Sequence, residues 1–229
     1  QEEHAKTMAG PTPDPVMQMI NGGWVAAVLG SAARHGVFEA LEQDGGTAET
    51  IAKQAGISMR GAQAVLDGLT GVGLLSYSGG RYRNTPEAST FLVKGKPSYL
   101  GGMAEVMTDG LTDWAKLPES VRTGQPMAAE TTDHPDNQFF EKLVPAIAAM
   151  SFPVAKSCAE RLGIADAGAI RWLDVGGGSG VWSAVWLQAN PQALAFQLDW
   201  PGVNAVARTF VGRFGVADRF RTIDGDFHV

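Results

Sequence analysis

A glycine-rich run between an acidic residue and an apolar segment is the part of this chain best suited to bind a ligand. The run extends from Gly176 to Gly180, and the apolar stretch before it contains Asp174. Glycine permits backbone angles that a Cβ atom would penalise, and it lets a ligand approach the main chain closely. The N–H groups that begin a following helix would then face that ligand. These residues therefore predict a turn that binds a nucleotide-like molecule.

The spacing of the glycines distinguishes several kinds of turn. A phosphate-binding P-loop ends in Gly-Lys-Ser/Thr, and no lysine follows Lys156. A dinucleotide site favours Gly-x-Gly-x-x-Gly/Ala, and counting from Gly176 places Val181 at the third position. The pattern present is Gly176-x-Gly178-x-Gly180. It fits neither phosphate-binding pattern well, and a turn that serves only packing is the structural alternative.

Such a turn needs a strand before it and a helix after it. Residues 172–175 are expected to form the strand and residues 181–187 the helix. A second strand is expected over 194–198, with Asp199 at its tip, where a carboxylate can accept both ribose hydroxyls of a nucleoside. A third strand, roughly 220–223, continues into Gly225, Asp226 and Phe227. The segment 166–229 therefore predicts an α/β unit, the first half of a Rossmann-like sheet.

Three segments of this unit resemble one known family. Residues 173–180 resemble the first motif of class I S-adenosyl-L-methionine (SAM) dependent methyltransferases nearly letter for letter. Residues 199–203 are similar to the Asp-x-Pro-x-Val of small-molecule O-methyltransferases, and residues 225–227 resemble their Gly-Asp-x-Phe element. The resemblance implies SAM as cofactor. It assigns glycines to the methionine part, one aspartate to the ribose, and aromatic and acidic residues to the adenine: Gly176, Gly178, Gly180, Asp199, Trp200, Asp226 and Phe227.

The N-terminal segment, residues 1–96, has the order of a winged-helix domain. Helices are expected over 16–29 and 31–41, then after Thr47 and after Ser58, followed by a hairpin over 74–83. A DNA-binding recognition helix should present several basic residues, yet the helix after Ser58 offers only Arg60, beside Asp67, and the net charge is −6. We therefore expect no nucleic-acid partner. The segment also resembles the domain that forms the homodimer of small-molecule O-methyltransferases.

Residues 97–165 are expected to be a helical connector, with helices over 101–123 and 137–162. Pro145 and Pro153 should kink or segment the second helix. The resemblance implies that this helix lines the pocket of the methyl acceptor, and ordinary core packing is the alternative for each of its aromatic and sulfur-containing candidates. The candidates are Phe139, Phe140, Met150 and Phe152.

The predicted sheet is shorter than the family's sheet, which has seven strands. We expect further strands from a longer or two-piece protein, or from a second chain. The family's usual catalytic histidine would lie there, and none of the four histidines present replaces it convincingly. His228 follows Asp226 closely, but we favour the alternative that it is a strand-end residue. We name no catalytic residue and predict no metal site.

Composition narrows the class of protein further. The chain has 229 residues and one cysteine, Cys158, which excludes an internal disulfide and favours a reducing, cytoplasmic compartment. No apolar run approaches the length of a membrane span, so no membrane partner is expected.

The resulting hypothesis is a SAM-dependent O-methyltransferase acting on a hydroxyl of a small aromatic or polyketide-like molecule. Three alternatives remain open. Relatives of this fold use SAM without methyl transfer, as hydroxylases, decarboxylases or pericyclases. The chain could also be a non-catalytic subunit completed by a second chain, or a winged-helix regulator with a ligand-sensing domain.

Overall fold

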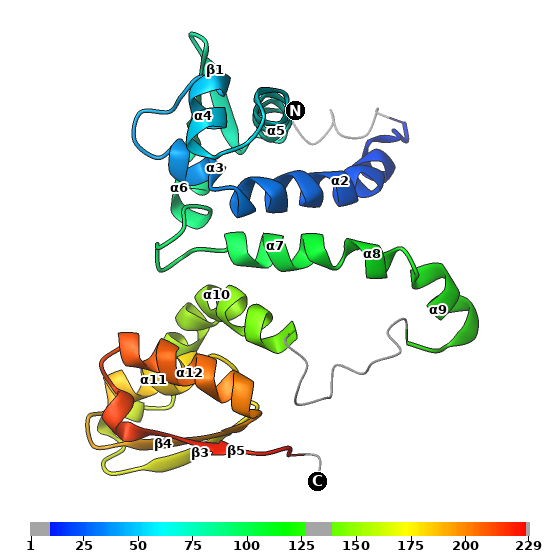
Figure 1. Ribbon diagram of the computed structural model, residues 1–229. Coiled ribbons are helices and arrows are strands. Elements are labelled where there is room, and N and C mark those ends of the chain that lie inside the picture. The colour runs from blue at the N-terminus through cyan, green and yellow to red at the C-terminus, as the bar shows by residue number, and fades with distance from the viewer. Residues whose placement is uncertain (1–9, 127–138, 228–229) are drawn as a thin grey trace.

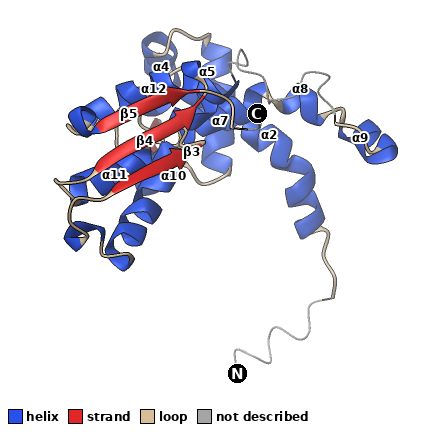
Figure 2. Cartoon of the chain, turned by 90° about the horizontal axis from the view of Figure 1, so that it is seen from below, coloured by secondary structure: helices blue, strands red, loops and turns tan. Residues whose placement is uncertain are grey.

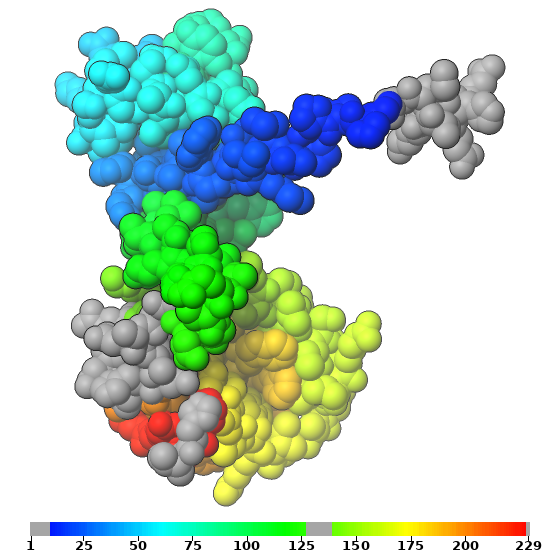
Figure 3. Space-filling view, turned by 90° about the vertical axis from the view of Figure 1, so that its right-hand side faces the viewer, coloured from blue at the N-terminus to red at the C-terminus, as the bar shows by residue number. Residues whose placement is uncertain are grey.

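The computed structural model describes residues 10–126 and 139–227, and it consists of two lobes with a helical segment between them (Figure 1). The N-terminal lobe contains α2 (Asp14–Arg34), α3 (Val37–Ala40), α4 (Ala48–Gln54), α5 (Met59–Gly71), β1 (Leu75–Ser78), β2 (Arg81–Asn84) and α6 (Pro86–Phe91). The segment that follows contains α7 (Gly101–Asp109), α8 (Leu111–Trp114) and α9 (Leu117–Thr123). From the side, α7 lies between the two lobes (Figure 3).

The C-terminal lobe alternates helices and strands. It contains α10 (Phe139–Arg161), a 3-10 turn (Ile164–Asp166), β3 (Arg171–Val175), α11 (Val181–Ala189), β4 (Leu194–Asp199), α12 (Pro201–Arg213), a second 3-10 turn (Ala217–Arg219) and β5 (Phe220–Asp224). All three predicted strands are present, each with an end shifted by no more than a residue or so. This order of strand, helix and strand produces a parallel sheet.

The first helix differs from its prediction. α2 continues through Gly22 and Gly23 to Arg34, so the expected division near residue 30 is wrong. Gly36 makes the break instead, because its φ of 68° lies in the left-handed region that only glycine enters easily. Glycines inside the helix weaken it, but packing can offset that weakness.

That packing is a close crossing of α2 with α7, which run side by side in Figure 1. A Cβ atom at Gly30 would lie 2.0 Å from Thr108 Oγ1, so no side chain fits there. The Thr108 hydroxyl is hydrogen-bonded at 3.0 Å to Ala26 O, on the facing helix. The crossing therefore depends on a glycine on one helix and a small polar residue on the other.

The predicted order of helix, helix and hairpin is present in the N-terminal lobe as α4, α5, β1 and β2. Thr47 Oγ1 accepts a hydrogen bond from Thr50 N, and Ser58 Oγ accepts one from Gly61 N, so both residues are N-caps. Gly79 and Gly80, with φ of 58° and 77°, form the two-residue hairpin turn. A contiguous apolar core holds these elements together, and its largest buried side chains are Phe38, Leu41, Ile51, Leu66 and Leu69.

The connector is more segmented than predicted. The single helix expected over 101–123 is three helices, with breaks at Gly110 and at Ala115–Lys116. Pro118 lies in the first turn of α9, where its missing N–H is tolerated. By contrast, α10 runs through both Pro145 and Pro153. A loop is expected between the two connector helices, and its residues 127–136 lie outside the described residues.

The sheet is parallel with strand order β3-β4-β5, so β3 and β5 are its edges among the described residues. Residues such as Ala195 and Gln197 face α11 and α12 and are fully buried. Leu173, Val175 and Ile223 point the other way and remain exposed. Figure 2, seen from that side, shows no described helix in front of the strands. One face of the sheet is thus covered and the other is bare.

α2 also bears on the expectation about membranes. Within residues 10–126 and 139–227, it alone has the length and composition of a membrane-spanning helix, contrary to the expectation that no apolar run approaches that length. A single helix of this kind near the N-terminus is weak evidence for a membrane.

Candidate functional site

The glycine turn lies at the carboxyl end of β3 and leads into α11. Gly176, Gly178 and Gly180 have φ values of 67°, 60° and 70°, so each occupies the left-handed region. A side chain at any of the three positions would strain the backbone. The sequence pattern therefore selected the three positions at which backbone conformation requires glycine.

Gly177 is required for a different reason, which the pattern did not reveal. Its φ is not in the left-handed region, but a Cβ atom there would lie 2.5 Å from Gln197 Oε1 and 2.8 Å from Asp174 Cγ. The turn is pressed against two buried polar side chains. Neither side chain was among the predicted binding residues, and only their burial on the covered face of the sheet reveals them.

Asp199 lies at the end of β4, next to the turn, as predicted. Its Oδ2 accepts a hydrogen bond from Gly178 N at 2.9 Å, and its Oδ1 accepts one from Trp200 N at 2.8 Å. A carboxylate has about four acceptor sites on its two oxygens. The two backbone donors fix the carboxylate and leave acceptor capacity for hydroxyl groups of a ligand.

Asp174 is a second carboxylate beneath the turn. Burial raises its pKa above the ordinary value of 3.8, a hydrogen bond from Ser183 opposes that shift, and the negative charge of Asp199 adds to it. Ser183 Oγ donates to Asp174 Oδ2 at 3.0 Å and accepts from Trp172 Nε1 at 3.0 Å. A hydrogen-bonded cluster of Trp172, Ser183 and Asp174 therefore lies beneath the turn, and the pKa of its carboxyl group is raised.

The segment after β5 reaches the same turn. A Cβ atom at Gly176 would lie 3.6 Å from the Phe227 ring, so this ring lies against the turn. Asp226 immediately precedes Phe227 in that segment. The three strand ends thus bring together the glycines, Asp199 and the Asp226–Phe227 pair, as parallel strands of one sheet must. His228 lies outside the described residues.

The aromatic candidates divide into two groups. Phe140 on α10 meets Trp200 edge to face, with ring centroids 5.6 Å apart, and Phe139 lies 5.4 Å from Phe140. These rings border the site. Phe152 instead packs against Phe214, at the opposite end of α12 from Trp200, and Met150 is exposed. Phe152 thus lies away from the Trp200 group of rings, and the roles of Phe152 and Met150 in an acceptor pocket stay predictions.

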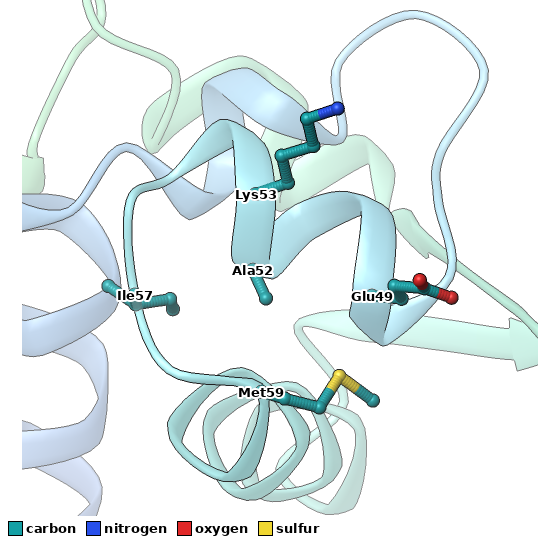
Figure 4. A pocket seen from close by; sticks show the side chains of 5 residues that line it. All are labelled: Glu49, Ala52, Lys53, Ile57 and Met59. Atoms are coloured by element: carbon teal, nitrogen blue, oxygen red, sulfur yellow. The ribbon is translucent and has the colours of Figure 1, made fainter.

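The structure has a surface hollow in the C-terminal lobe and another in the N-terminal lobe. One of about 390 Å³ lies between α10 and α12, where Glu141 and Gly202 face each other. The other, of about 530 Å³, lies between α4 and α5 in the N-terminal lobe and is lined by Glu49, Ala52, Lys53, Ile57 and Met59 (Figure 4). The second hollow shares no residue with the glycine turn.

Comparison with known proteins gives a consistent relationship. Residues 17–94 match the O-methyltransferase dimerisation domain. The chain is 30% identical over 222 residues to 3-hydroxy-5-methyl-1-naphthoate 3-O-methyltransferase of Streptomyces sahachiroi, covering 94% of this chain and 63% of that protein. It is 31% identical over 235 residues to acetylserotonin O-methyltransferase of Rattus norvegicus, covering 93% and 51%.

The fold agrees with these sequences. The structure of human N-acetylserotonin methyltransferase in complex with SAM superposes with a TM-score of 0.79 at 21% identity, covering 97% of this chain and 68% of that one. The chain spans between about half and two thirds of the length of the curated relatives it matches most strongly. Nearly the whole chain is therefore similar to O-methyltransferases, and its residues 17–94 match their dimerisation domain.

Proposed function

We propose that this chain provides the SAM-binding half of an O-methyltransferase that methylates a hydroxyl group of a small aromatic or polyketide-like molecule. The observation that carries the proposal is the meeting of three strand ends around one glycine turn. The names of two relatives support this class of acceptor, because they describe a naphthoate O-methyltransferase and a tetracenomycin O-methyltransferase.

The residues present fit an adenosyl ligand. Gly176, Gly178 and Gly180 leave the turn without side chains, so a ligand can lie directly against the main chain. Asp199 is held by two backbone donors and can accept hydrogen bonds from both ribose hydroxyls. Phe227 and Trp200 supply apolar ring surface, and Asp226 supplies an acceptor for the adenine amino group.

When bound, SAM would supply an electrophilic methyl group on its sulfonium sulfur. The residues of this chain would then position the acceptor, because methyl transfer requires the acceptor oxygen to be aligned with that carbon. Phe140 and Phe139 border the site from α10 and would bound the acceptor. The group that removes the hydroxyl proton is left unassigned.

The proposal divides the chain into three parts. Residues 1–96 would dimerise, 97–165 would connect the parts and line the acceptor pocket, and 166–229 would bind SAM. The exposed apolar side chains of α2 support a homodimer through the N-terminal lobe, and they include Met17, Met19, Ile20 and Trp24. Such a continuous apolar stripe on one helix is typical of a surface that a second copy covers.

The test is direct binding of S-adenosylhomocysteine (SAH) and SAM, measured by titration calorimetry. We expect Asp199→Asn to weaken binding about ten- to a hundredfold, since hydrogen bonds to a charged group contribute about 1.5–3 kcal/mol. Asp218→Asn changes an exposed aspartate in the turn before β5 and should leave the affinity unchanged. Absence of binding to the unmodified protein, or equal affinities for both variants, would contradict the proposal.

A further inference from the structure

Gln197 is a polar side chain at a buried position, where packing alone would favour an apolar residue. It lies in the middle of β4 on the covered face of the sheet and is 0% exposed. Its Nε2 donates to Gly178 O at 3.0 Å and to Asn204 Oδ1 at 3.2 Å. Burying an amide is unfavourable unless its hydrogen bonds are made, so these two bonds matter for the local structure.

Asn204 continues the chain of hydrogen bonds from α12 to the other strand ends. It is also 0% exposed. Its Nδ2 lies 2.9 Å from Asp199 O, 3.0 Å from Ile223 O and 2.7 Å from Asp224 Oδ1. All three are acceptors, so they fix the orientation of the amide, and its Oδ1 is left to accept from Gln197.

The two amides therefore connect all three loops of the candidate site. Gly178 belongs to the glycine turn after β3, Asp199 ends β4, and Ile223 and Asp224 end β5 just before the Asp226–Phe227 segment. A shift of one loop would break a bond to Gln197 or Asn204. The pair fixes the relative positions of parts that hold different portions of one ligand.

Stability alone does not explain this arrangement. Gln197 Oε1 is buried and has no hydrogen-bond partner. Leaving a buried acceptor unsatisfied is costly. An apolar residue would remove that acceptor and could fill the space next to Gly177 and Gly180. It would lose the bonds to Gly178 O in the glycine turn and to Asn204 Oδ1.

We propose that Gln197 and Asn204 are positioning residues of the SAM site, which hold the three loops in the single arrangement that the adenosyl ligand requires. This inference rests on the proposed function for the identity of the ligand. The pair touches no reacting atom and acts through the loop residues that it binds, which are Gly178, Asp199, Ile223 and Asp224.

Gln197→Met gives the sharpest test, because it removes the bond to the turn and the unsatisfied acceptor Oε1 together. It also leaves Asn204 Oδ1 without its donor, so one unsatisfied buried acceptor replaces another. We expect a small change in melting temperature and an SAH dissociation constant at least tenfold higher. A residue with only a structural role would change stability and leave the affinity alone.

Asn204→Leu has a matched control in Asn190→Leu. Asn190 is also a buried asparagine, and its Nδ2 donates to Ile164 O and Gly168 O, each at 2.9 Å, at the amino end of the strands. Both substitutions should lower the melting temperature. Only Asn204→Leu should weaken SAH binding tenfold or more, and Asn190→Leu should stay within twofold of the unmodified protein.

Hydrogen exchange of the peptides covering 176–180 and 224–227 supplies a readout that needs no ligand. We expect faster exchange in both peptides for Gln197→Met and Asn204→Leu, and normal exchange for Asn190→Leu. If the unmodified protein binds neither SAH nor SAM, the proposed function fails while the exchange data still test the positioning role. Unchanged exchange and an affinity within twofold in Gln197→Met would overturn the inference.

Discussion

Asp174 and Gly177 show how single residues set the properties of the glycine turn. The carboxyl group of Asp174 lies on the covered face of the sheet, where burial favours its neutral form. Gly177 is pressed between that carboxyl group and Gln197. Both features are consequences of placing a ligand-binding turn directly on a packed sheet.

The titration of Asp174 makes a prediction about pH. Burial raises its folded-state pKa above 3.8, so between the two pKa values the folded state binds more protons than the unfolded state. The free energy of unfolding therefore falls as pH rises through that window. We expect Asp174→Asn to be more stable than the unmodified protein at pH 7, with the difference vanishing below the unfolded-state pKa. Chemical denaturation across pH measures it; a constant, destabilising difference would mean that the Ser183 bond dominates.

Gly177→Ala tests the contact between the turn and Gln197. The added methyl group would meet Gln197 Oε1 and Asp174 Cγ at less than 3 Å, so one of them must move. We expect a loss of about 1–3 kcal/mol of stability, which is usual for overpacking, together with weaker SAH binding. Gly212→Ala, in the same lobe with nothing within 4 Å of the new methyl group, is the control and should be neutral or stabilising.

The helices show how one element depends on its neighbour. α2 needs a glycine at position 30 because α7 approaches it closely there, and Thr108 fills the space a side chain would need. The breaks elsewhere follow local rules, since Gly36 has positive φ and Pro118 begins α9. Close packing decides where a helix can continue, and backbone chemistry decides where it must stop.

Gly30→Ala should disturb this crossing, because the new methyl group would lie 2.0 Å from Thr108 Oγ1 and 2.6 Å from Ala104 O. We expect a loss of about 1–3 kcal/mol, or more if the helices separate. Gly23→Ala, in the same helix but with open space around it, should gain up to about 1 kcal/mol. Thermal denaturation of the two variants compares them directly, and equal effects would exclude the crossing as the cause.

The whole molecule leaves two apolar surfaces bare among the residues described. One is the face of the sheet that carries Leu173, Val175 and Ile223, and the other is the stripe on α2. The α2 stripe lies within the segment that matches a dimerisation domain. Trp24 is 72% exposed there, and an exposed tryptophan amid other apolar residues is typical of an interface anchor.

The double variant Ile20→Glu/Trp24→Glu should weaken the proposed homodimer by at least tenfold, because burying two carboxylates in an apolar interface is unfavourable. Sedimentation velocity over a range of concentrations measures the monomer–dimer equilibrium. Leu162→Glu changes an equally exposed apolar residue at the end of α10 and should leave the equilibrium unchanged. A double variant that dimerises normally would place the interface elsewhere.

Local chemistry in the sequence determined much of this protein. The alternation of apolar segments and turns predicted the strands and helices of the C-terminal lobe, and Thr47, Ser58 and the Gly79–Gly80 turn predicted the winged-helix order. Gly176, Gly178, Gly180 and Asp199 were identified from spacing, because backbone conformation and the position at a strand end depend on neighbouring residues alone. Their roles in ligand binding remain predictions.

Only the tertiary structure decided the rest. The close approach at Gly30 of α2 depends on α7, a helix far along the chain. Phe140 and Phe152 have equivalent local patterns, yet one meets Trp200 and the other meets Phe214. Gln197 and Asn204 carry no sequence signal, since an amide is informative only once its burial and partners are known. Local rules fix backbone conformation; contacts between distant segments fix which side chains meet.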